Sequence, residues 1–359
     1  MRRFFIMLAC MAALSFVACG NDKPEESAEL QSENIYDKKE EAEPTEEADP
    51  YESMAESPFT GEYIDKETAR LRPFAVVINN LHKALPQSGI GQADIYYEVL
   101  AEGEITRITA VFQDFDAEKI GPVRSAREYF TCFALDSDAV FVHHGGSETG
   151  YAAIKNRGVE NIDGMVSGAF WRDSERAGMP GMYEHSSYTS AGNIKKEAEE
   201  KGYRKYLDEN YPGMFSFYES ETQLTGEAVN AASVSLPYSS YQISGFLYDP
   251  QERVYSRFQS GEPQIDELTG EQIKVKNIII QNAKTWAIAG DDAGRRGVEL
   301  VGSGAGMFIT NGKARNITWE KDSFSSPTRW YDEKGNVLKL NKGKTWICVF
   351  PDNIEYTLE

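Results

Sequence analysis

Two arginines that follow a Gly-Pro pair are the side chains best suited to bind an anion. Arg124, Ser125 and Arg127 open a stretch with helical apolar spacing, which predicts a helix over 125–135. Both arginines would then share one face beside the helix N-terminus, where free amides and a partial positive charge favour a phosphate or carboxylate. Their guanidinium groups would hold it through charge-assisted hydrogen bonds. The alternative is that they pair with acids of this chain, such as Glu98, and stabilise the fold.

A His-His-Gly-Gly-Ser sequence at residues 143–147 is the second candidate. It follows a predicted strand and precedes a predicted helix over 148–156, for which Ser147 is a suitable N-cap. Ligands of α/β proteins bind preferentially at the carboxyl ends of strands. We expect His143 or His144 to enter a site there while the other points away. The alternative is a glycine-rich turn with one packed histidine.

Three further side chains are expected to join these two motifs. Arg107 begins a predicted strand, and Arg172 and His185 lie on a long segment expected to close over the same crevice. The predicted ligand-binding residues are Arg107, Arg124, Ser125, Arg127, His143, His144, Arg172 and His185. An enzyme would use the same residues, with the arginines stabilising charge and a histidine moving a proton.

Composition argues against several other functions. The 359 residues hold 37 Lys and Arg against 57 Asp and Glu, and this net charge of −20 disfavours a nucleic-acid partner. Only four His and four Cys are present, which argues against a His-rich metal site, a multi-Cys zinc site and a disulfide framework. The sequence therefore predicts no metal and no cofactor. Ser125, Ser147 and Ser187 lie outside any Gly-x-Ser-x-Gly elbow, which argues against a serine hydrolase.

The strands and helices that must hold these residues follow an α/β pattern in the first part of the chain. Apolar runs that are continuous rather than alternating predict strands buried on both faces. These runs cover 73–78, 94–100, 107–112 and 139–142. They alternate with predicted helices, the last over 194–201, so residues 59–232 are expected to form an α/β domain with a mixed sheet.

The rest of the chain has a different pattern. Residues 233–359 consist of short β-prone runs separated by turn residues, which predicts a mainly antiparallel β domain, either a barrel or a sandwich. Gly302–Gly306 is interpreted as a turn with a bulge. The boundary between the regions is placed at 203–232, and the predicted fold class is α+β overall.

The N-terminus predicts the location of the protein. Two arginines precede an uncharged apolar run that ends in Ala18-Cys19, as in a bacterial lipoprotein signal, so residues 1–18 are expected to be cleaved and Cys19 lipidated. Residues 20–58 contain 14 acids and 3 lysines, a net charge of −11. We expect residues 19–58 to form an extended, disordered tether.

Short motifs throughout the chain resemble the YerB-like lipoproteins of Gram-positive bacteria. In the first region they are Arg72-Pro73, Pro86–Gly89, Gln92–Asp94, Tyr97-Glu98, Ile105–Arg107, Ile120–Arg127 and His143–Gly146. In the second they are Tyr248-Asp249, Tyr255–Arg257, Thr269-Gly270, Asp291–Arg295, Gly302–Gly304 and Gly343–Ile347. The resemblance implies a lipid-anchored extracytoplasmic protein with two domains. It assigns no biochemical role.

Three functions remain open from the sequence. The leading hypothesis is a lipoprotein, anchored in the cell membrane, that binds a phosphate- or carboxylate-bearing component of the cell wall or envelope. The second is an envelope hydrolase or transferase at the same arginine–histidine site. The third is an interaction scaffold without a small ligand. The sequence predicts no oligomeric state.

Overall fold

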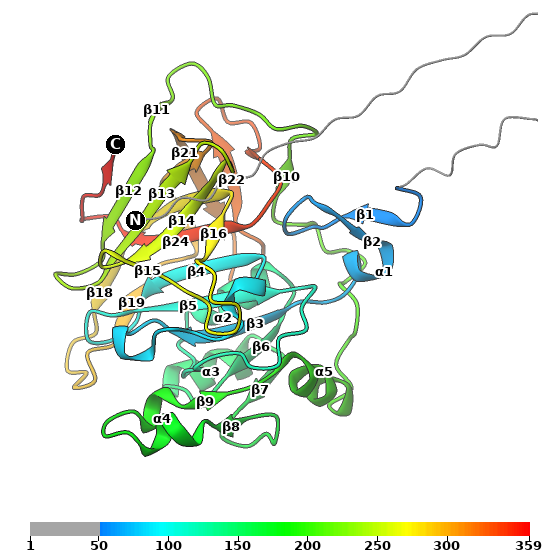
Figure 1. Cartoon of the computed structure of the whole chain (residues 1–359), viewed down its shortest axis with the longest axis vertical. Coiled ribbons are helices and arrows are strands. Elements are labelled where there is room, and N and C mark those ends of the chain that lie inside the picture. Colours follow the sequence, from blue (N-terminus) through cyan, green and yellow to red (C-terminus); the bar gives the residue numbers. More distant parts are fainter. Residues whose placement is uncertain (1–50) are drawn as a thin grey trace, which may run out of the picture. The chain divides into compact units, whose positions relative to one another are not determined.

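A mixed sheet of eleven strands runs through the centre of the protein, which the computed structural model describes over residues 51–359 (Figure 1). Its strands are β3 (Phe74–Asn79), β4 (Ile95–Leu100), β5 (Thr106–Phe112), β6 (Val140–His143), β7 (Asn161–Asp163), β11 (Val229–Asn230), β17 (Asn277–Ala283), β20 (Gly302–Thr310), β21 (Lys313–Lys321), β22 (Arg329–Asp332) and β24 (Thr345–Pro351). They follow the order β11-β21-β20-β17-β24-β4-β5-β3-β6-β7, with β22 paired to β21.

The strands predicted in the first region are confirmed as β3, β4, β5 and β6. β5 pairs antiparallel with both β3 and β4, whereas β6 pairs parallel with β3 and with β7. Every residue of β3, β4, β5 and β6 is buried, as expected for continuous apolar runs in a sheet covered on both faces. The expected mixed sheet is therefore present.

This sheet continues across the predicted boundary between the two regions. β4 pairs parallel with β24, from Ile95 opposite Thr345 to Val99 opposite Val349, and β24 pairs parallel with β17. The described residues form one compact unit. The sequence boundary at 203–232 thus separates two regions of the chain but not two sheets.

A second, antiparallel sheet of six strands confirms the β-rich character of the C-terminal region. Its strands are β12 (Ser233–Pro237), β13 (Ile243–Asp249), β14 (Val254–Gln259), β15 (Glu262–Pro263), β16 (Lys274–Val275) and β25 (Thr357–Leu358). Buried positions alternate along β12 and β14, which indicates that one face packs inward.

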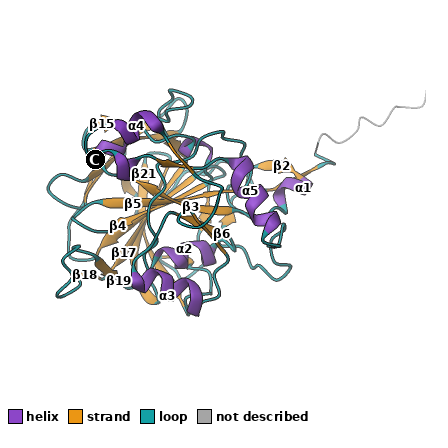
Figure 2. Cartoon of the chain, turned by 90° about the horizontal axis from the view of Figure 1, so that it is seen from below, coloured by secondary structure: helices purple, strands orange, loops and turns teal. Residues whose placement is uncertain are grey.

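Helices cover both faces of the central sheet (Figure 2). The helices are α1 (Lys66–Ala69), α2 (Phe130–Asp136), α3 (Glu148–Asn156), α4 (Ser174–Gly178) and α5 (Ala191–Glu200), with 3-10 turns η1 (His82–Ala84), η2 (Ile90–Gln92) and η3 (Tyr183–His185). Ser147 caps α3 by accepting a hydrogen bond from the Gly150 amide, as predicted. No helix within residues 51–359 is long and apolar enough to cross a membrane.

The helix predicted over 125–135 begins only at Phe130. Up to Ala126 the chain is extended, and its backbone groups bond to other strands instead of to a helix. The Arg124 amide donates to the Val77 carbonyl, and the Ala126 amide donates to the Gly145 carbonyl. Because these donors are already used, Arg124 and Arg127 do not lie at a helix N-terminus, and that part of the prediction is wrong.

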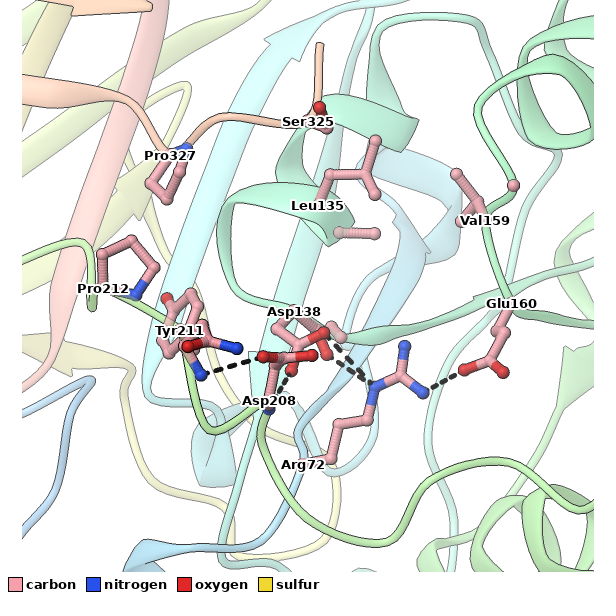
Figure 3. A pocket seen from close by; sticks show the side chains of 14 residues that line it. Arg72, Leu135, Asp138, Val159, Glu160, Asp208, Tyr211, Pro212, Ser325 and Pro327 are labelled. Carbon is pink, nitrogen blue, oxygen red and sulfur yellow. Dashed lines mark hydrogen bonds and ion pairs between the residues drawn. The ribbon is translucent and has the colours of Figure 1, made fainter. Parts of the chain in front are cut away.

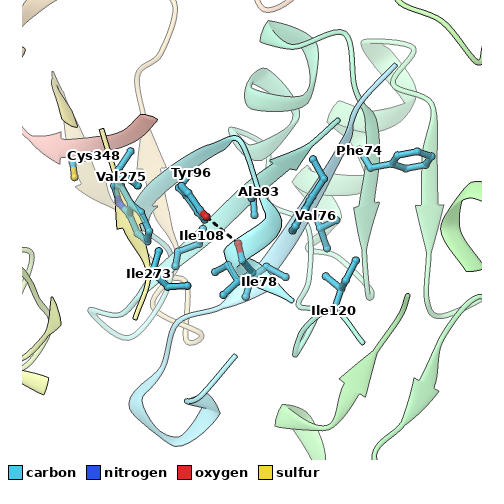
Figure 4. Packing of buried hydrophobic residues seen from close by; sticks show 14 of the residues in the cluster. Phe74, Val76, Ile78, Ala93, Tyr96, Ile108, Ile120, Ile273, Val275 and Cys348 are labelled. Atoms are coloured by element: carbon cyan, nitrogen blue, oxygen red, sulfur yellow. Dashed lines mark hydrogen bonds between the residues drawn. The ribbon is translucent and has the colours of Figure 1, made fainter. Parts of the chain in front are cut away.

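Two hydrophobic clusters lie on opposite faces of the sheet. On β3, Phe74, Val76 and Ile78 belong to the cluster that also packs against the second sheet and α5 (Figure 4). Ala75 and Val77 belong to the other cluster, beneath α2 and α3. This alternation explains why the strand sequence is apolar throughout.

Gly302–Gly306 lies within β20 and is not a turn, which corrects the interpretation from sequence. A Cβ atom at Gly306 would lie 2.4 Å from the Ile280 carbonyl oxygen, and one at Gly304 would lie 2.6 Å from the Trp319 ring nitrogen. The glycines therefore permit close approach inside a sheet, which is their other common role in strands.

Four two-stranded pairs complete the fold. They are β1 (Met54–Glu56) with β2 (Tyr63–Asp65), β8 (Trp171–Arg172) with β9 (Ser187–Tyr188), β10 (Ser216–Phe217) with β23 (Lys339–Leu340), and β18 (Thr285–Ala287) with β19 (Arg296–Val298). β1 lies inside the segment predicted as the tether, and its hairpin pairing with β2 shows that residues 54–56 are ordered, which corrects the predicted end at residue 58. The predicted signal peptide, Cys19 and the tether up to residue 50 lie outside the described residues.

Candidate functional site

The extended segment that carries Arg124 lies beside the ends of β3 and β9. Its Val123 amide donates to the Ser187 carbonyl, and the Arg124 carbonyl accepts from the His144 amide. These bonds bring the loop after β6 and the loop before β9 to the same place. Arg124, His144 and His185 therefore lie close together, although Arg124 and His185 are 61 positions apart in the sequence.

Glu102 holds two of the predicted arginines together. Its Oε1 pairs with the Arg107 guanidinium, and its Oε2 accepts from Nε of Arg127 at 3.0 Å. Arg107 is buried and also donates to the Ser125 carbonyl at 2.7 Å. Of the two arginines for which the sequence left a structural pairing open, it applies to Arg127, with Glu102 as the acid in place of Glu98. Arg107 is paired with the same carboxylate.

Arg124 has a weaker partner. Its Nη1 donates to the Glu184 carbonyl at 2.8 Å, and its Nη2 donates to the Glu184 carboxylate at 3.2 Å. The Glu184 side chain is 73% exposed, and within the described residues it is the only carboxylate that pairs with Arg124. The buried Nε of Arg124 has no partner in this part of the chain. Arg124 is therefore neutralised by an acid that solvent can reach.

The two adjacent histidines point in different directions, as predicted. His143 is fully buried, stacks on Phe141 and is bonded through Nδ1 to the Gly145 carbonyl at 2.9 Å. Burial lowers the pKa of His143 from its ordinary value. Because His143 packs inside the fold, it supports the loop, and of the adjacent pair it is His144 that contacts Ser187 and Arg172.

His144 joins a serine to an arginine. Its Nδ1 is 2.6 Å from the Ser187 hydroxyl, and its Nε2 is 3.4 Å from Nη2 of Arg172. Since the guanidinium can only donate, Nε2 carries the lone pair and Nδ1–H donates to Ser187. In this tautomer the Ser187 hydroxyl oxygen accepts from His144. Burial, and then Arg172, lower the pKa of His144.

His185 completes the group from the turn η3. It is buried, and its Nδ1 accepts a hydrogen bond from the side-chain amide nitrogen of Asn79 at 2.7 Å. Burial, followed by the charge of Arg124, lowers its pKa. We name Arg124, His144, Arg172 and His185 the arginine–histidine cluster. Four of the eight predicted residues form it, while Arg107, Ser125, Arg127 and His143 brace its surroundings.

A different set of arginines, which the sequence did not assign to one place, surrounds a cavity. The cavity has a volume of about 340 Å³ and is lined by Arg127, Arg157, Arg295 and Arg296. These residues come from three separate places in the chain, because Arg295 and Arg296 are adjacent, so only the tertiary structure brings the three together. An Arg-Arg pair flanked by glycines at 294 and 297 was the available signal.

A second cavity, of about 240 Å³, lies beside Arg72 (Figure 3). Arg72 donates through Nε to the Asp138 carbonyl at 2.7 Å and pairs with Glu160. The Asp138 carboxylate in turn accepts from Arg204 and from the Asp208 amide. Since these charges are paired with one another, the cavity is best explained as part of the scaffold.

Comparison with known proteins identifies the family. Residues 59–204 match the N-terminal domain of a protein family of unknown function, DUF3048, and residues 234–347 match its C-terminal domain. The protein named "Putative lipoprotein YerB" of Bacillus subtilis (strain 168) is 35% identical over 302 residues, or 82% of this chain and 86% of that protein. This chain belongs to the YerB-like DUF3048 family.

The fold agrees with that of a solved YerB structure. The crystal structure of the YerB protein from Bacillus subtilis matches with a TM-score of 0.73 at 34% identity, over 85% of this chain and 99% of that chain. The arginine–histidine cluster lies entirely in the N-terminal DUF3048 region, whereas Arg295 and Arg296 belong to the C-terminal one. Among the described residues, no three His, Cys, Asp or Glu side chains are placed to hold a metal ion.

Proposed function

We propose that this chain is an extracytoplasmic lipoprotein, anchored in the cell membrane through Cys19, and that its folded part binds an anionic envelope ligand at the arginine–histidine cluster. The lipoprotein signal at Ala18-Cys19 and the name of its YerB relative support the anchor. The observation that supports the binding site is the pairing of Arg124 with the exposed carboxylate of Glu184.

Glu184 occupies the position that the carboxylate or phosphate of a ligand would take. An ion pair with an exposed partner contributes only about 0–1 kcal/mol, so an incoming anion displaces it at little cost. The free Nε of Arg124 then offers the ligand a second donor beside Nη2. Such two-pronged contacts are the usual way in which arginine recognises phosphate and carboxylate.

Arg172 and the two histidines supply the rest of the site. Arg172 donates to the Tyr183 carbonyl through Nη1, and its Nη2 contacts His144. The lowered pKa values keep the imidazoles of His144 and His185 neutral at pH 7, so they act there as hydrogen-bonding groups. A serine nucleophile at Ser187 would require His144 to accept the hydroxyl proton, and the Arg172 contact favours the opposite tautomer.

Calorimetric titration of the purified full chain with inorganic phosphate and with acetate tests the proposal. Replacing Arg124 by Ala should weaken binding roughly 10- to 100-fold, because charge-assisted hydrogen bonds contribute about 1.5–3 kcal/mol each. Glu184→Gln should strengthen binding by up to roughly fivefold, because it removes the competing carboxylate.

Arg70→Ala is the matched control, since Arg70 is an exposed arginine paired with Glu67 on α1. The control should bind like the wild type. If Arg124→Ala also binds like the wild type, or if neither anion binds the wild type at all, the cluster is structural and the scaffold hypothesis replaces the binding hypothesis.

A further inference from the structure

The cavity beside the β18–β19 hairpin has an unusual charge for so acidic a chain. Its lining includes Arg127, Arg157, Arg295 and Arg296, against two glutamates, whereas the chain as a whole has a net charge of −20. A concave site with excess positive charge concentrates anions, because the field of the arginines adds inside the cavity. We call it the hairpin cavity.

Three of these arginines already have partners. Arg127 pairs with Glu102, Arg157 pairs with Glu128 at 2.7 Å, and Arg295 pairs with Asp291 at 2.6 Å. Their charges make the electrostatic potential inside the cavity more positive. Their guanidinium groups are already paired, so a ligand does not need to displace these carboxylates. Their carboxylate partners also fix their positions, so the wall is built before a ligand arrives.

Arg296 is different. Within residues 51–359 its guanidinium makes no hydrogen bond and no ion pair, although the cavity also contains Glu299. The Nε atom of Arg296 is buried without a partner. A buried guanidinium donor without an acceptor costs free energy, which an anion in the cavity would recover. Arg296 is therefore the donor available to a ligand.

A second wall of the hairpin cavity contains the exposed aromatic side chains Trp286 and Phe324, and the Arg157 guanidinium lies over the Phe324 ring, 3.6 Å from its centroid. Trp286 is 45% exposed and Phe324 is 46% exposed. The indole of Trp286 lies against Gly297 on the neighbouring strand, where a Cβ atom would come within 2.3 Å of the ring. Glycine at this position thus lets the indole lie against the neighbouring strand, and its 45% exposure leaves part of the ring open for stacking beside the Lys284 ammonium, which lies 5.9 Å from the ring centroid.

From these two walls we infer that the hairpin cavity binds a small phosphorylated ring compound, with its phosphate on Arg296 and its flat ring against Trp286. The ring is that of a sugar, which offers a face of C–H groups to the indole, or of a nucleobase, which offers a flat π face. A volume of about 340 Å³ accommodates a molecule of this size. This site is separate from the arginine–histidine cluster and does not depend on it.

The test is calorimetric titration of the full chain with inorganic phosphate, glucose 1-phosphate and adenosine monophosphate, and with glucose and adenosine. The affinity for at least one phosphorylated ring compound should be at least tenfold higher than the affinity for inorganic phosphate. It should also be at least tenfold higher than the affinity for the same compound without its phosphate. Whichever of glucose 1-phosphate and adenosine monophosphate binds more tightly shows whether the ring is a sugar or a nucleobase.

Three variants divide the contributions of the walls. Arg296→Gln should weaken both phosphorylated compounds at least tenfold. Trp286→Ala should remove the advantage over inorganic phosphate while leaving phosphate binding unchanged, and Gly297→Ala should do the same because its methyl group displaces the indole. Thermal melting of each variant shows whether it remains folded.

Arg70→Ala, at an exposed arginine paired with Glu67, serves as the matched control and should bind these compounds like the wild type. The inference is overturned if no phosphorylated ring compound exceeds inorganic phosphate, or if folded Arg296→Gln and Trp286→Ala proteins bind like the wild type. If Arg124→Ala alone weakens binding, the anion belongs to the arginine–histidine cluster, and the hairpin cavity is not the site.

Discussion

The carboxylate of Glu98 and the guanidinium of Arg257 form an ion pair at 3.1 Å in which both side chains are 0% exposed. Glu98 lies on β4 and Arg257 on β14, so the pair connects the central sheet to the second sheet. Glu98 also accepts from the Trp346 ring nitrogen at 3.1 Å and from Ser244 at 2.6 Å. This network joins the two DUF3048 regions at the centre of the fold.

The buried pair predicts a large loss of stability when one partner is removed. Arg257→Met should lower the free energy of unfolding by about 3–5 kcal/mol, because the buried Glu98 carboxyl group would lose its ion-pair partner. The double variant Glu98→Gln/Arg257→Met should recover part of that loss. Urea unfolding at pH 7 measures both, with Arg70→Met as an exposed control. A loss below about 1 kcal/mol for Arg257→Met would show that the pair does not hold the sheets together.

Asp94 predicts a dependence of stability on pH. Its enclosure by protein, opposed by a hydrogen bond from the Gln113 amide and by Lys344, raises the pKa of Asp94 to about 7. A carboxyl whose pKa is higher in the folded state binds its proton more tightly there, so its contribution to stability is complete below about pH 4 and is lost as the pH rises through about 7. Melting temperatures from pH 4 to pH 8 should therefore fall less steeply for Asp94→Asn than for the wild type. Parallel curves for the two proteins would refute the assignment.

Gly306 predicts the cost of adding a single methyl group. Gly306→Ala would place a Cβ atom 2.4 Å from the Ile280 carbonyl oxygen, which belongs to the backbone of the neighbouring strand and cannot easily move. We expect a loss of roughly 1–3 kcal/mol in the free energy of unfolding, as for other overpacked sites. Gly168→Ala is the control, because no atom lies within 4 Å of the added methyl group. Equal stability of the two variants would contradict the close approach.

Cys19 predicts the cellular fraction in which the protein is found. Wild-type protein should fractionate with membranes, and Cys19→Ala should fail to mature and to attach through a lipid, because two acyl chains on the thiol provide stable anchoring. Cys10→Ala is the matched control within the same N-terminal segment and should behave like the wild type. Identical processing and membrane content for Cys19→Ala and wild type would exclude the lipid anchor.

Local patterns were sufficient for the strands of the first region and for one helix cap. The runs at β3, β4, β5 and β6 are buried at every position and mostly apolar because both faces of the sheet are covered, and that requirement is visible in any single strand. Ser147 was recognisable as a cap because capping involves only residues within the same turn. The candidate residues Arg124, His144, Arg172 and His185 were recognisable by their chemical type.

Their partners were not recognisable, because they depend on contacts between distant parts of the chain. Arg124 and Arg127 were placed at a helix start, but the Arg124 amide is used by β3, so the local helical preference yields to a long-range bond. Glu184 neutralises Arg124 from 60 residues away.

The same limit applies to the sheet and to the hairpin cavity. Parallel pairing of β4 with β24 joins segments about 250 residues apart, and apolar strands carry no local mark of which neighbour they will choose. Arg296 and Trp286 line the same cavity only because β18 pairs with β19. Sequence patterns therefore predicted strands, a helix cap and the reactive side chains. Packing between distant segments decided which charged side chains pair with each other, and it left Arg296 without a partner among residues 51–359.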